Sequence, residues 1–183
     1  MQRILALTLT AAPAASRTLL EATQRKIGMV PNLFSTIAHS PAALAGHLHQ
    51  SDALAGGVLT PVLREQLALV TAGENGCDYC ASAHTLMGKG AGLTSAEAAR
   101  NLQGHADNAK TQAALSFAKA ILASRGQISD SQLAAVRSAG YSDAEVVEIV
   151  AHVGMNVFTN YFNNLARTTV DFPLVSTAQA RAA

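Results

Sequence analysis

The chain has 183 residues, of which 49% are hydrophobic, so it is long enough for one domain with a substantial core. Its net charge is only +1, which gives no electrostatic basis for binding nucleic acid or an anionic membrane surface. The most apolar segment, residues 143–166, carries glutamates, a histidine and several asparagines, so it is not expected to span a membrane. We therefore expect a single domain over residues 1–183, with no nucleic acid and no membrane among its partners.

The N-terminal segment, MQRILALTLTAAPAAS, allows two interpretations. A basic residue, a short apolar run and several small residues are typical of a secretory signal peptide. However, Thr8 and Thr10 interrupt the apolar run, and Pro13 lies near the position where a signal peptide would be cleaved. We favour an N-terminal arm over residues 1–16 and a cytoplasmic location, with a targeting segment as the alternative.

Capping residues and glycines divide the chain that follows into helices. Serine, threonine and asparagine favour the position before a helix, proline favours its first turn, and glycine favours its end. The sequence predicts helices over residues 17–27, 33–38, 41–54, 61–74, 77–87, 95–102, 108–124, 129–138 and 143–166. In this scheme Ser16 caps the first helix, and Gly88 and Gly90 end the fifth. No useful stretch alternates like a strand, so the predicted fold class is all-α, with a tail over residues 171–183 that has little reason to be ordered alone.

The central motif of the chain lies between Glu65 and His84. Both cysteines of the protein, Cys77 and Cys80, stand here in a C-x-x-C spacing, with the glutamate twelve residues before the first and the histidine four residues after the second. In a helix that begins near Cys77, the two cysteines and the histidine stand at i, i+3 and i+7, so they share one face. The connection to the preceding helix is short, so that helix must fold back and bring the glutamate near.

These residue types indicate redox chemistry. A thiolate is favoured at a helix N-terminus or beside a histidine, and two thiols one turn apart can form a reversible disulfide. His84 can accept the proton of Cys80, and Glu65 can orient the imidazole. Two alternatives stay open: half of a zinc site, with His84 as only a third ligand, or two inert core cysteines. His47 and His49 are two residues apart and cannot share a helix face, so we expect them to be solvated or satisfied locally, and we predict no metal and no cofactor.

The pattern Glu65-x11-Cys77-x2-Cys80-x3-His84 resembles the active-site motif of the AhpD-like branch of the carboxymuconolactone decarboxylase family, the alkylhydroperoxidase-type proteins. The segment GMVPNLFSTIAHSP, residues 28–41, is similar to the one that precedes this motif in peroxidase-related members. The resemblance extends from there to the end of the last predicted helix. It implies a compact all-α AhpD-like domain with the C-x-x-C at the start of a helix, and thiol-dependent reduction of hydroperoxides.

The resemblance also implies a role for each residue of the motif. Cys80 corresponds to the cysteine that the histidine assists, Cys77 to its disulfide partner, His84 to the proton acceptor and Glu65 to the relay carboxylate. The implied partners are a hydroperoxide substrate, an external dithiol reductant and further copies of the chain in a homo-oligomer, a trimer or hexamer. Tyr79 stands between the cysteines where some hydroperoxidases have a histidine, which leaves the substrate and the reductant open. Decarboxylase members lack the cysteine pair, so the lactone reaction is not expected.

The last predicted helix, residues 143–166, is apolar almost all round, which predicts burial at the centre of the domain or between subunits. It also carries a polar stripe, formed by His152, Asn156, Asn160 and Asn163. Buried polar groups need partners. One interpretation is a hydrogen-bonded seam between helices or subunits; the other places His152 or Asn156, together with Tyr79, in the wall of the active pocket.

The sequence thus predicts an all-helical thiol peroxidase. An all-α context argues against thioredoxin, whose C-x-x-C follows a strand. Two other functions remain: a thiol–disulfide oxidoreductase that acts on a partner protein, and a non-catalytic redox sensor whose disulfide changes its assembly.

Overall fold

The computed structural model describes residues 1–178, and this part of the chain contains nine α-helices and no β-strand. The predicted all-α class is therefore confirmed. The helices are α1 (Ala14–Ile27), α2 (Asn32–Ile37), α3 (Pro41–Ala55), α4 (Pro61–Asn75), α5 (Asp78–Ala91), α6 (Ser95–Leu102), α7 (Ala109–Ser124), α8 (Asp130–Ser138) and α9 (Asp143–Ala166).

Local capping chemistry explains most of these boundaries. Thr60 accepts a hydrogen bond from the amide of Leu63 at the start of α4, and Pro61 follows at the first helical position. Ser142 and Glu145 form a reciprocal capping box at the start of α9. Gly76 ends α4 with φ +62°, a left-handed conformation that glycine adopts without steric cost. The chain can therefore turn within two residues, and α5 packs back onto α4.

Two predicted helix boundaries are wrong, in both cases because of tertiary packing. Helix α1 begins at Ala14, and Ser16 is no cap but a buried side chain whose hydroxyl donates to the carbonyl of Ala38 at 2.7 Å. Helix α5 continues through Gly88 to Ala91 and ends at the left-handed Gly92. A Cβ atom on Gly88 would lie 2.9 Å from the side chain of Leu93, so this glycine serves close packing rather than helix termination. One glycine inside a helix costs only about 1 kcal/mol.

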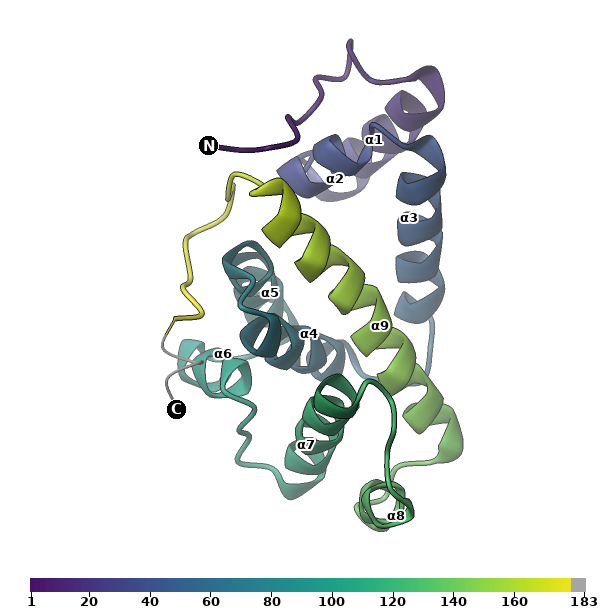
Figure 1. The fold of residues 1–183 in the computed structure, drawn as a ribbon, viewed down its shortest axis with the longest axis vertical. Coiled ribbons are helices and arrows are strands. Elements are labelled where there is room, and N and C mark those ends of the chain that lie inside the picture. The colour runs from purple at the N-terminus through teal and green to yellow at the C-terminus, as the bar shows by residue number, and fades with distance from the viewer. Residues whose placement is uncertain (179–183) are drawn as a thin grey trace.

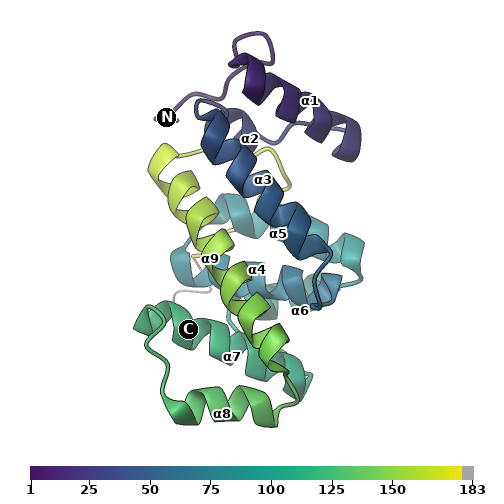
Figure 2. The same cartoon turned by 90° about the vertical axis from the view of Figure 1, so that its right-hand side faces the viewer.

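Helix α4 lies at the centre of the molecule, in contact with α5, α6, α7 and α9. Figures 1 and 2 show α9 crossing the molecule diagonally, with α1, α2 and α3 towards one end and α7 and α8 at the other. Leu69 of α4 belongs to a core shared with α1, α2, α3, α5 and α6, whereas Leu67 and Val70 belong to a second core with α7, α8 and α9. Because α4 faces two cores, almost all of its residues from Leu63 to Gly73 are buried.

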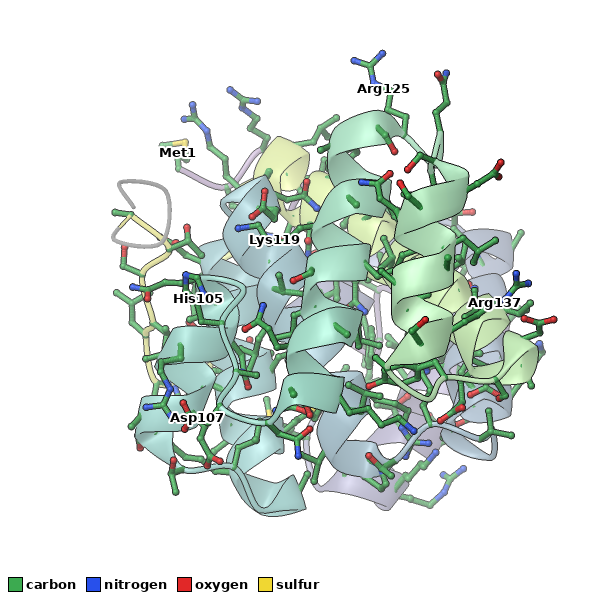
Figure 3. All side chains as sticks on the ribbon, turned by 90° about the horizontal axis from the view of Figure 1, so that it is seen from below. Met1, His105, Asp107, Lys119, Arg125 and Arg137 are labelled. Carbon is green, nitrogen blue, oxygen red and sulfur yellow. The ribbon has the colours of Figure 1, made fainter. Side chains whose placement is uncertain are left out.

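The α7–α8 end of the molecule carries many of the exposed charges (Figure 3). Arg137 forms an ion pair with Asp143 at 2.8 Å, and Lys119 forms one with Glu74 at 3.0 Å. Arg125 projects from the C-terminal end of α7, where its own backbone is left-handed with φ +56°. The side chains of these pairs are partly or largely exposed to solvent, so each pair contributes little to stability.

The end of the described chain packs against α5. The backbone amide of Val175 donates to the hydroxyl of Ser82 at 2.9 Å, and the amide and hydroxyl of Thr177 both donate to one carboxylate oxygen of Asp78 at 2.7 Å. The predicted tail is thus attached to the start of α5 up to residue 178; its last residues, 179–183, lie outside the described part. None of the helices in residues 1–178 is long and apolar enough to cross a membrane. The cytoplasmic location stays a prediction.

Candidate active site

The candidate site lies at the N-terminal end of α5, where this helix meets α4 and α9. Cys77 is the N-cap residue of α5: its sulfur accepts a hydrogen bond from the backbone amide of Cys80 at 3.3 Å. The left-handed Gly76 directly before it sets the direction in which the chain enters the helix. The partial positive charge of a helix N-terminus favours a thiolate there.

The two cysteines are free thiols, and both are buried, with 1% of Cys77 and 2% of Cys80 exposed. The hydrogen bond between the two side chains has opposite effects on them. It lowers the pKa of Cys80 to about 6, aided by the charge of His84 and by nearby asparagine side chains and opposed by burial. The same hydrogen bond, together with burial, raises the pKa of Cys77 far above its ordinary value. At neutral pH, therefore, Cys80 is the thiolate and Cys77 the thiol that donates to it.

Part of the polar stripe of α9, together with Thr159, lies around the sulfur of Cys80. The side-chain amide of Asn163 donates to this sulfur at 3.3 Å. The hydroxyl of Thr159 lies 3.9 Å from it and donates to the backbone carbonyl of Asn156 at 3.0 Å. Asn160 accepts a hydrogen bond from Asn75 of α4 at 3.0 Å, which fixes α9 against the end of α4. Part of the predicted seam thus lies directly on the reactive sulfur.

Glu65 and His84 form the contact that the motif predicts. His84 Nδ1 lies 2.8 Å from Glu65 Oε2, and the two side chains are 19% and 20% exposed. Burial disfavours the charged imidazole, but the charge of Glu65 and its hydrogen bond outweigh this effect and raise the pKa of His84. The carboxylate therefore holds the proton on Nδ1 and leaves Nε2 as the basic nitrogen. Within residues 1–178 no hydrogen bond joins His84 to Cys80, although their charges influence each other.

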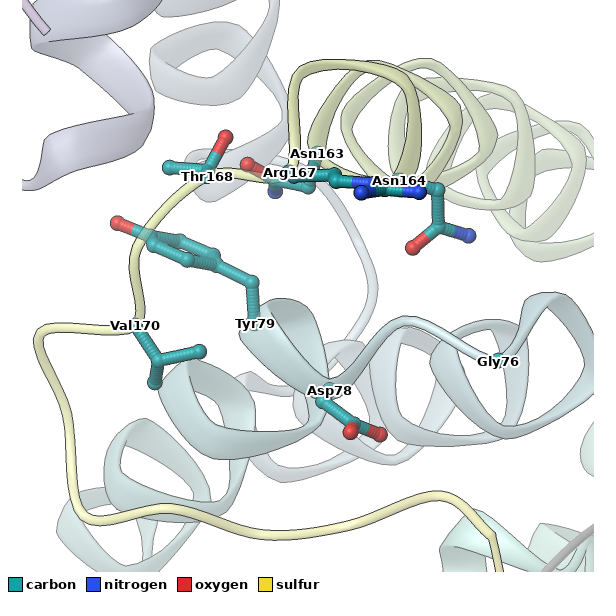
Figure 4. A pocket seen from close by; sticks show the side chains of 8 residues that line it. All are labelled: Gly76, Asp78, Tyr79, Asn163, Asn164, Arg167, Thr168 and Val170. Atoms are coloured by element: carbon teal, nitrogen blue, oxygen red, sulfur yellow. The ribbon is translucent and has the colours of Figure 1, made fainter. Parts of the chain in front are cut away.

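Of the three residues predicted to line the active pocket, only Tyr79 lines the pocket described here. Tyr79 is buried, accepts a hydrogen bond from the amide of Leu33 at 3.0 Å, and lines a pocket of about 200 Å³ (Figure 4). His152 and Asn156 do not line this pocket. Asn156 instead donates to the backbone carbonyl of His152 at 2.8 Å, a contact within α9. Burial lowers the pKa of His152, so it is neutral at physiological pH.

Three residues near the site carried no specific signal in the sequence. Asn163 was one member of a stripe, and nothing distinguished Thr159, because only the packing of α9 against α5 brings them to Cys80. His47 was expected to be solvated or satisfied locally, and this is wrong. Its ring lies between Phe34 and Phe158, with centroid distances of 5.6 and 6.0 Å, and its buried Nδ1 has no hydrogen-bond partner among the described residues. Burial first, and the charge of His84 second, lower its pKa.

The described residues contain no group of three or more histidine, cysteine, aspartate or glutamate side chains that could hold a metal ion. The side chains of the site offer a stabilised thiolate, a second thiol beside it, and a carboxylate-oriented base nearby. This combination suits nucleophilic attack by sulfur followed by closure of a disulfide.

Comparison with known proteins identifies related folds. Residues 38–123 match the carboxymuconolactone decarboxylase family. A peroxidase-related protein from Ralstonia eutropha JMP134, described as an alkylhydroperoxidase AhpD core, is 26% identical with a TM-score of 0.85 over 93% of this chain and 92% of that one. A peroxidase-related protein from Silicibacter sp. TM1040 is 22% identical, with a TM-score of 0.79 over 92% of each chain.

The same fold also occurs in a debrominase in complex with 2,3,4-tribromopyrrole, which is 18% identical, with a TM-score of 0.76 over 98% of this chain and 94% of that one. No curated protein matches the chain in sequence. The fold thus accommodates more than one chemistry, and the activity of this chain has to be argued from its own residues.

Proposed function

Because residues 38–123 match the carboxymuconolactone decarboxylase family and the chain has the fold of AhpD-like proteins, we propose that it is a thiol-dependent peroxidase that reduces hydroperoxides through Cys80 and Cys77. The observation that carries this proposal is the buried pair of free thiols at the start of α5, where the Cys77 sulfur accepts a hydrogen bond from the Cys80 amide at 3.3 Å and Asn163 donates to the Cys80 sulfur at 3.3 Å. This environment lowers the pKa of Cys80 to about 6 and raises that of Cys77. A peroxide-reducing cysteine needs a thiolate at neutral pH and a second thiol within bonding distance.

In the first step the Cys80 thiolate attacks the terminal oxygen of the hydroperoxide. A sulfur–oxygen bond forms, the oxygen–oxygen bond breaks, and the alcohol leaves with a proton. His84 holds, as the imidazolium, the proton taken up from Cys80 when its thiolate formed, and it donates this proton to the departing alkoxide. Glu65 stabilises that imidazolium through the 2.8 Å contact. Cys80 is left as a sulfenic acid.

In the second step Cys77 attacks the sulfenic sulfur of Cys80. A disulfide forms, and hydroxide leaves and takes the Cys77 proton as water. Oxidation of Cys80 also removes the negative charge that keeps Cys77 protonated, so the second thiol becomes more acidic when it is needed. An external dithiol small enough to reach the buried pair then restores both thiols by disulfide exchange. The sum is one hydroperoxide and one dithiol converted to alcohol, water and a new disulfide.

Burial of the two sulfurs favours this reaction over thiol–disulfide exchange with a partner protein. Only 1% of Cys77 and 2% of Cys80 are exposed, and a disulfide on a folded protein cannot approach so closely. A small hydroperoxide needs far less displacement of the surrounding side chains. A redox sensor needs to be oxidised only once, whereas an enzyme reduces many hydroperoxide molecules when a dithiol is present. Repeated turnover therefore distinguishes the two functions.

The test is a single-turnover reaction of the reduced protein with hydrogen peroxide and with an alkyl hydroperoxide, followed by mass spectrometry. We expect the loss of two hydrogens from the protein and the release of one alcohol per chain. Cys77→Ser is expected to stop at the sulfenic acid, which dimedone traps, and Cys80→Ser is expected not to react. Two thiols that persist through peroxide treatment would refute the proposal, and oxidation that no dithiol can reverse would leave a sensor rather than an enzyme.

A further inference from the structure

Cys80 is closed off from solvent, so a substrate needs a way to reach its sulfur. Besides its partner Cys77, side chains of α9 lie around this sulfur: Asn163 at 3.3 Å, Thr159 at 3.9 Å, and Asn160, whose amide also helps to lower the pKa of Cys80. Asn163 also lines the pocket of about 200 Å³ shown in Figure 4, whereas Thr159 does not. The side chain of Asn163 thus connects this pocket with the sulfur of Cys80, and its rotation is a movement that would join them.

Two of the residues that line this pocket each have a buried side-chain oxygen with no hydrogen-bond partner among residues 1–178. These residues are Asn163 and Thr168, which are only 3% and 7% exposed. Leaving such a group unpaired costs on the order of 1–3 kcal/mol, so a native structure rarely keeps one without a reason. Both atoms can accept hydrogen bonds, but both are closed off as the side chains stand, so a ligand with an O–H group reaches the Asn163 oxygen only when this amide rotates towards the pocket.

A cation lies in the same wall. Arg167 lines the pocket from the C-terminal end of α9, where its backbone is left-handed with φ +52°, and in the described part of the chain it forms no ion pair. The first turn of α5 borders the pocket through Gly76, Asp78 and Tyr79. The carboxylate of Asp78 is held by Thr177, and Figure 4 shows it pointing away from Arg167. The side of the pocket near α9 is therefore positive.

We propose that this pocket is the entrance to Cys80 for small carboxylate-bearing substrates. Arg167 holds the carboxylate, and the side chain of Asn163, rotated towards the pocket, accepts a hydrogen bond from the reacting end through its oxygen. The volume of about 200 Å³ holds about seven groups of the size of a water molecule, at ~30 Å³ each, which is enough for a carboxylate, a short chain and a hydroperoxide. The hydroperoxide as the reacting group rests on the proposed function; the entrance and its preference for a carboxylate do not.

The entrance can be tested without peroxide chemistry, by alkylation of Cys80 with iodoacetate and with iodoacetamide. The two reagents have nearly the same size, and both form a sulfur–carbon bond with loss of iodide, but only iodoacetate carries a carboxylate. Because both need the same thiolate, the ratio of their rates is independent of the pKa of Cys80. We expect this ratio to fall about tenfold in Arg167→Gln, the scale of one charge-assisted hydrogen bond at a partly exposed site. Peptide mapping confirms that Cys80 is the residue modified.

Two further variants control this experiment. Arg167→Lys keeps the charge and is expected to keep most of the preference for iodoacetate. Arg125→Gln removes the other arginine that ends a helix in a left-handed conformation, at the C-terminus of α7, and is expected to leave the ratio unchanged. A ratio that is the same in wild type and Arg167→Gln overturns the proposed entrance.

A short hydroperoxide with a terminal carboxylate, compared with its methyl ester, links the entrance to turnover. We expect the acid to oxidise Cys80 faster than the ester in the wild type, and this difference to disappear in Arg167→Gln. If neither compound oxidises Cys80 while the preference for iodoacetate persists, the entrance stands and the peroxidase proposal fails. The opposite outcome is that the acid and the ester oxidise Cys80 at equal rates, and that Arg167→Gln changes neither the iodoacetate-to-iodoacetamide ratio nor the acid-to-ester ratio. In that case the peroxidase proposal stands and the entrance is overturned.

Discussion

Asn163→Leu tests how far α9 controls the reactivity of Cys80. This substitution keeps the approximate size of the side chain and removes the amide that donates to the sulfur at 3.3 Å. A hydrogen bond to a charged group contributes about 1.5–3 kcal/mol, and one pKa unit corresponds to about 1.4 kcal/mol. The pKa of Cys80, about 6 in the wild type, is therefore expected to rise by about 1–2 units.

The rise in pKa has a direct kinetic consequence. At pH 6 about half of the wild-type Cys80 is thiolate, and a rise of about 1–2 units lowers this fraction by about 5- to 50-fold. The pH dependence of iodoacetamide alkylation, and of thiolate absorbance in the ultraviolet, measures the shift. Asn163→Asp should raise the pKa at least as much, because it places a carboxylate beside the thiolate.

Asn101→Leu is the matched control for this prediction. Asn101 is equally buried, in α6, and its amide donates to the backbone carbonyl of His105 at 2.8 Å rather than to sulfur. It is expected to lower stability without changing the titration of Cys80. If Asn163→Leu is folded by circular dichroism and its Cys80 still titrates near pH 6, the hydrogen bond from α9 does not stabilise the thiolate and the reasoning is refuted.

Three further predictions concern the relay, the pH dependence of stability and the assembly. His84→Gln is expected to lower the rate of peroxide reduction by about 10²–10⁴-fold, and Glu65→Gln by less. Because the relay acts as a unit, the double variant is expected to lose much less than the product of the two single effects. Unchanged rates in folded variants would remove both residues from the mechanism. The folded pKa of His84 is raised, so its contribution to stability is complete below the unfolded value near 6.5 and is lost as pH rises through the folded pKa. Urea unfolding should therefore show a larger deficit of His84→Gln relative to wild type at acid than at alkaline pH; an equal deficit would contradict the raised pKa. Finally, one face of α9 stays exposed although it is apolar, and we expect it to be covered in a homo-oligomer; light scattering that shows a monomer at micromolar concentration would contradict this. The residues of this face are Val147, Val150, Phe158, Tyr161 and Leu165.

The amino-acid sequence by itself determined the helices and the local geometry of the cysteine pair. Helix ends depend on residues within one turn of each other, so the caps at Thr60 and Ser142 and the break at Gly76 were readable from the sequence. For the same reason the C-x-x-C spacing placed both sulfurs in the first turn of α5. The boundaries failed at Ser16 and Gly88, where a distant backbone carbonyl and a leucine side chain, rather than neighbouring residues, decide the conformation.

Only the tertiary structure decided how the two thiols differ. The sequence paired His84 with Cys80 but did not predict that the pKa values of the two thiols shift in opposite directions. These shifts arise from the geometry of their shared hydrogen bond and from side chains on α9. Asn163 is 83 residues from Cys80 along the chain, so its contact depends on the angle and register at which α9 crosses α5. That crossing is fixed by the packing of two hydrophobic cores on opposite faces of α4, and no local pattern encodes it.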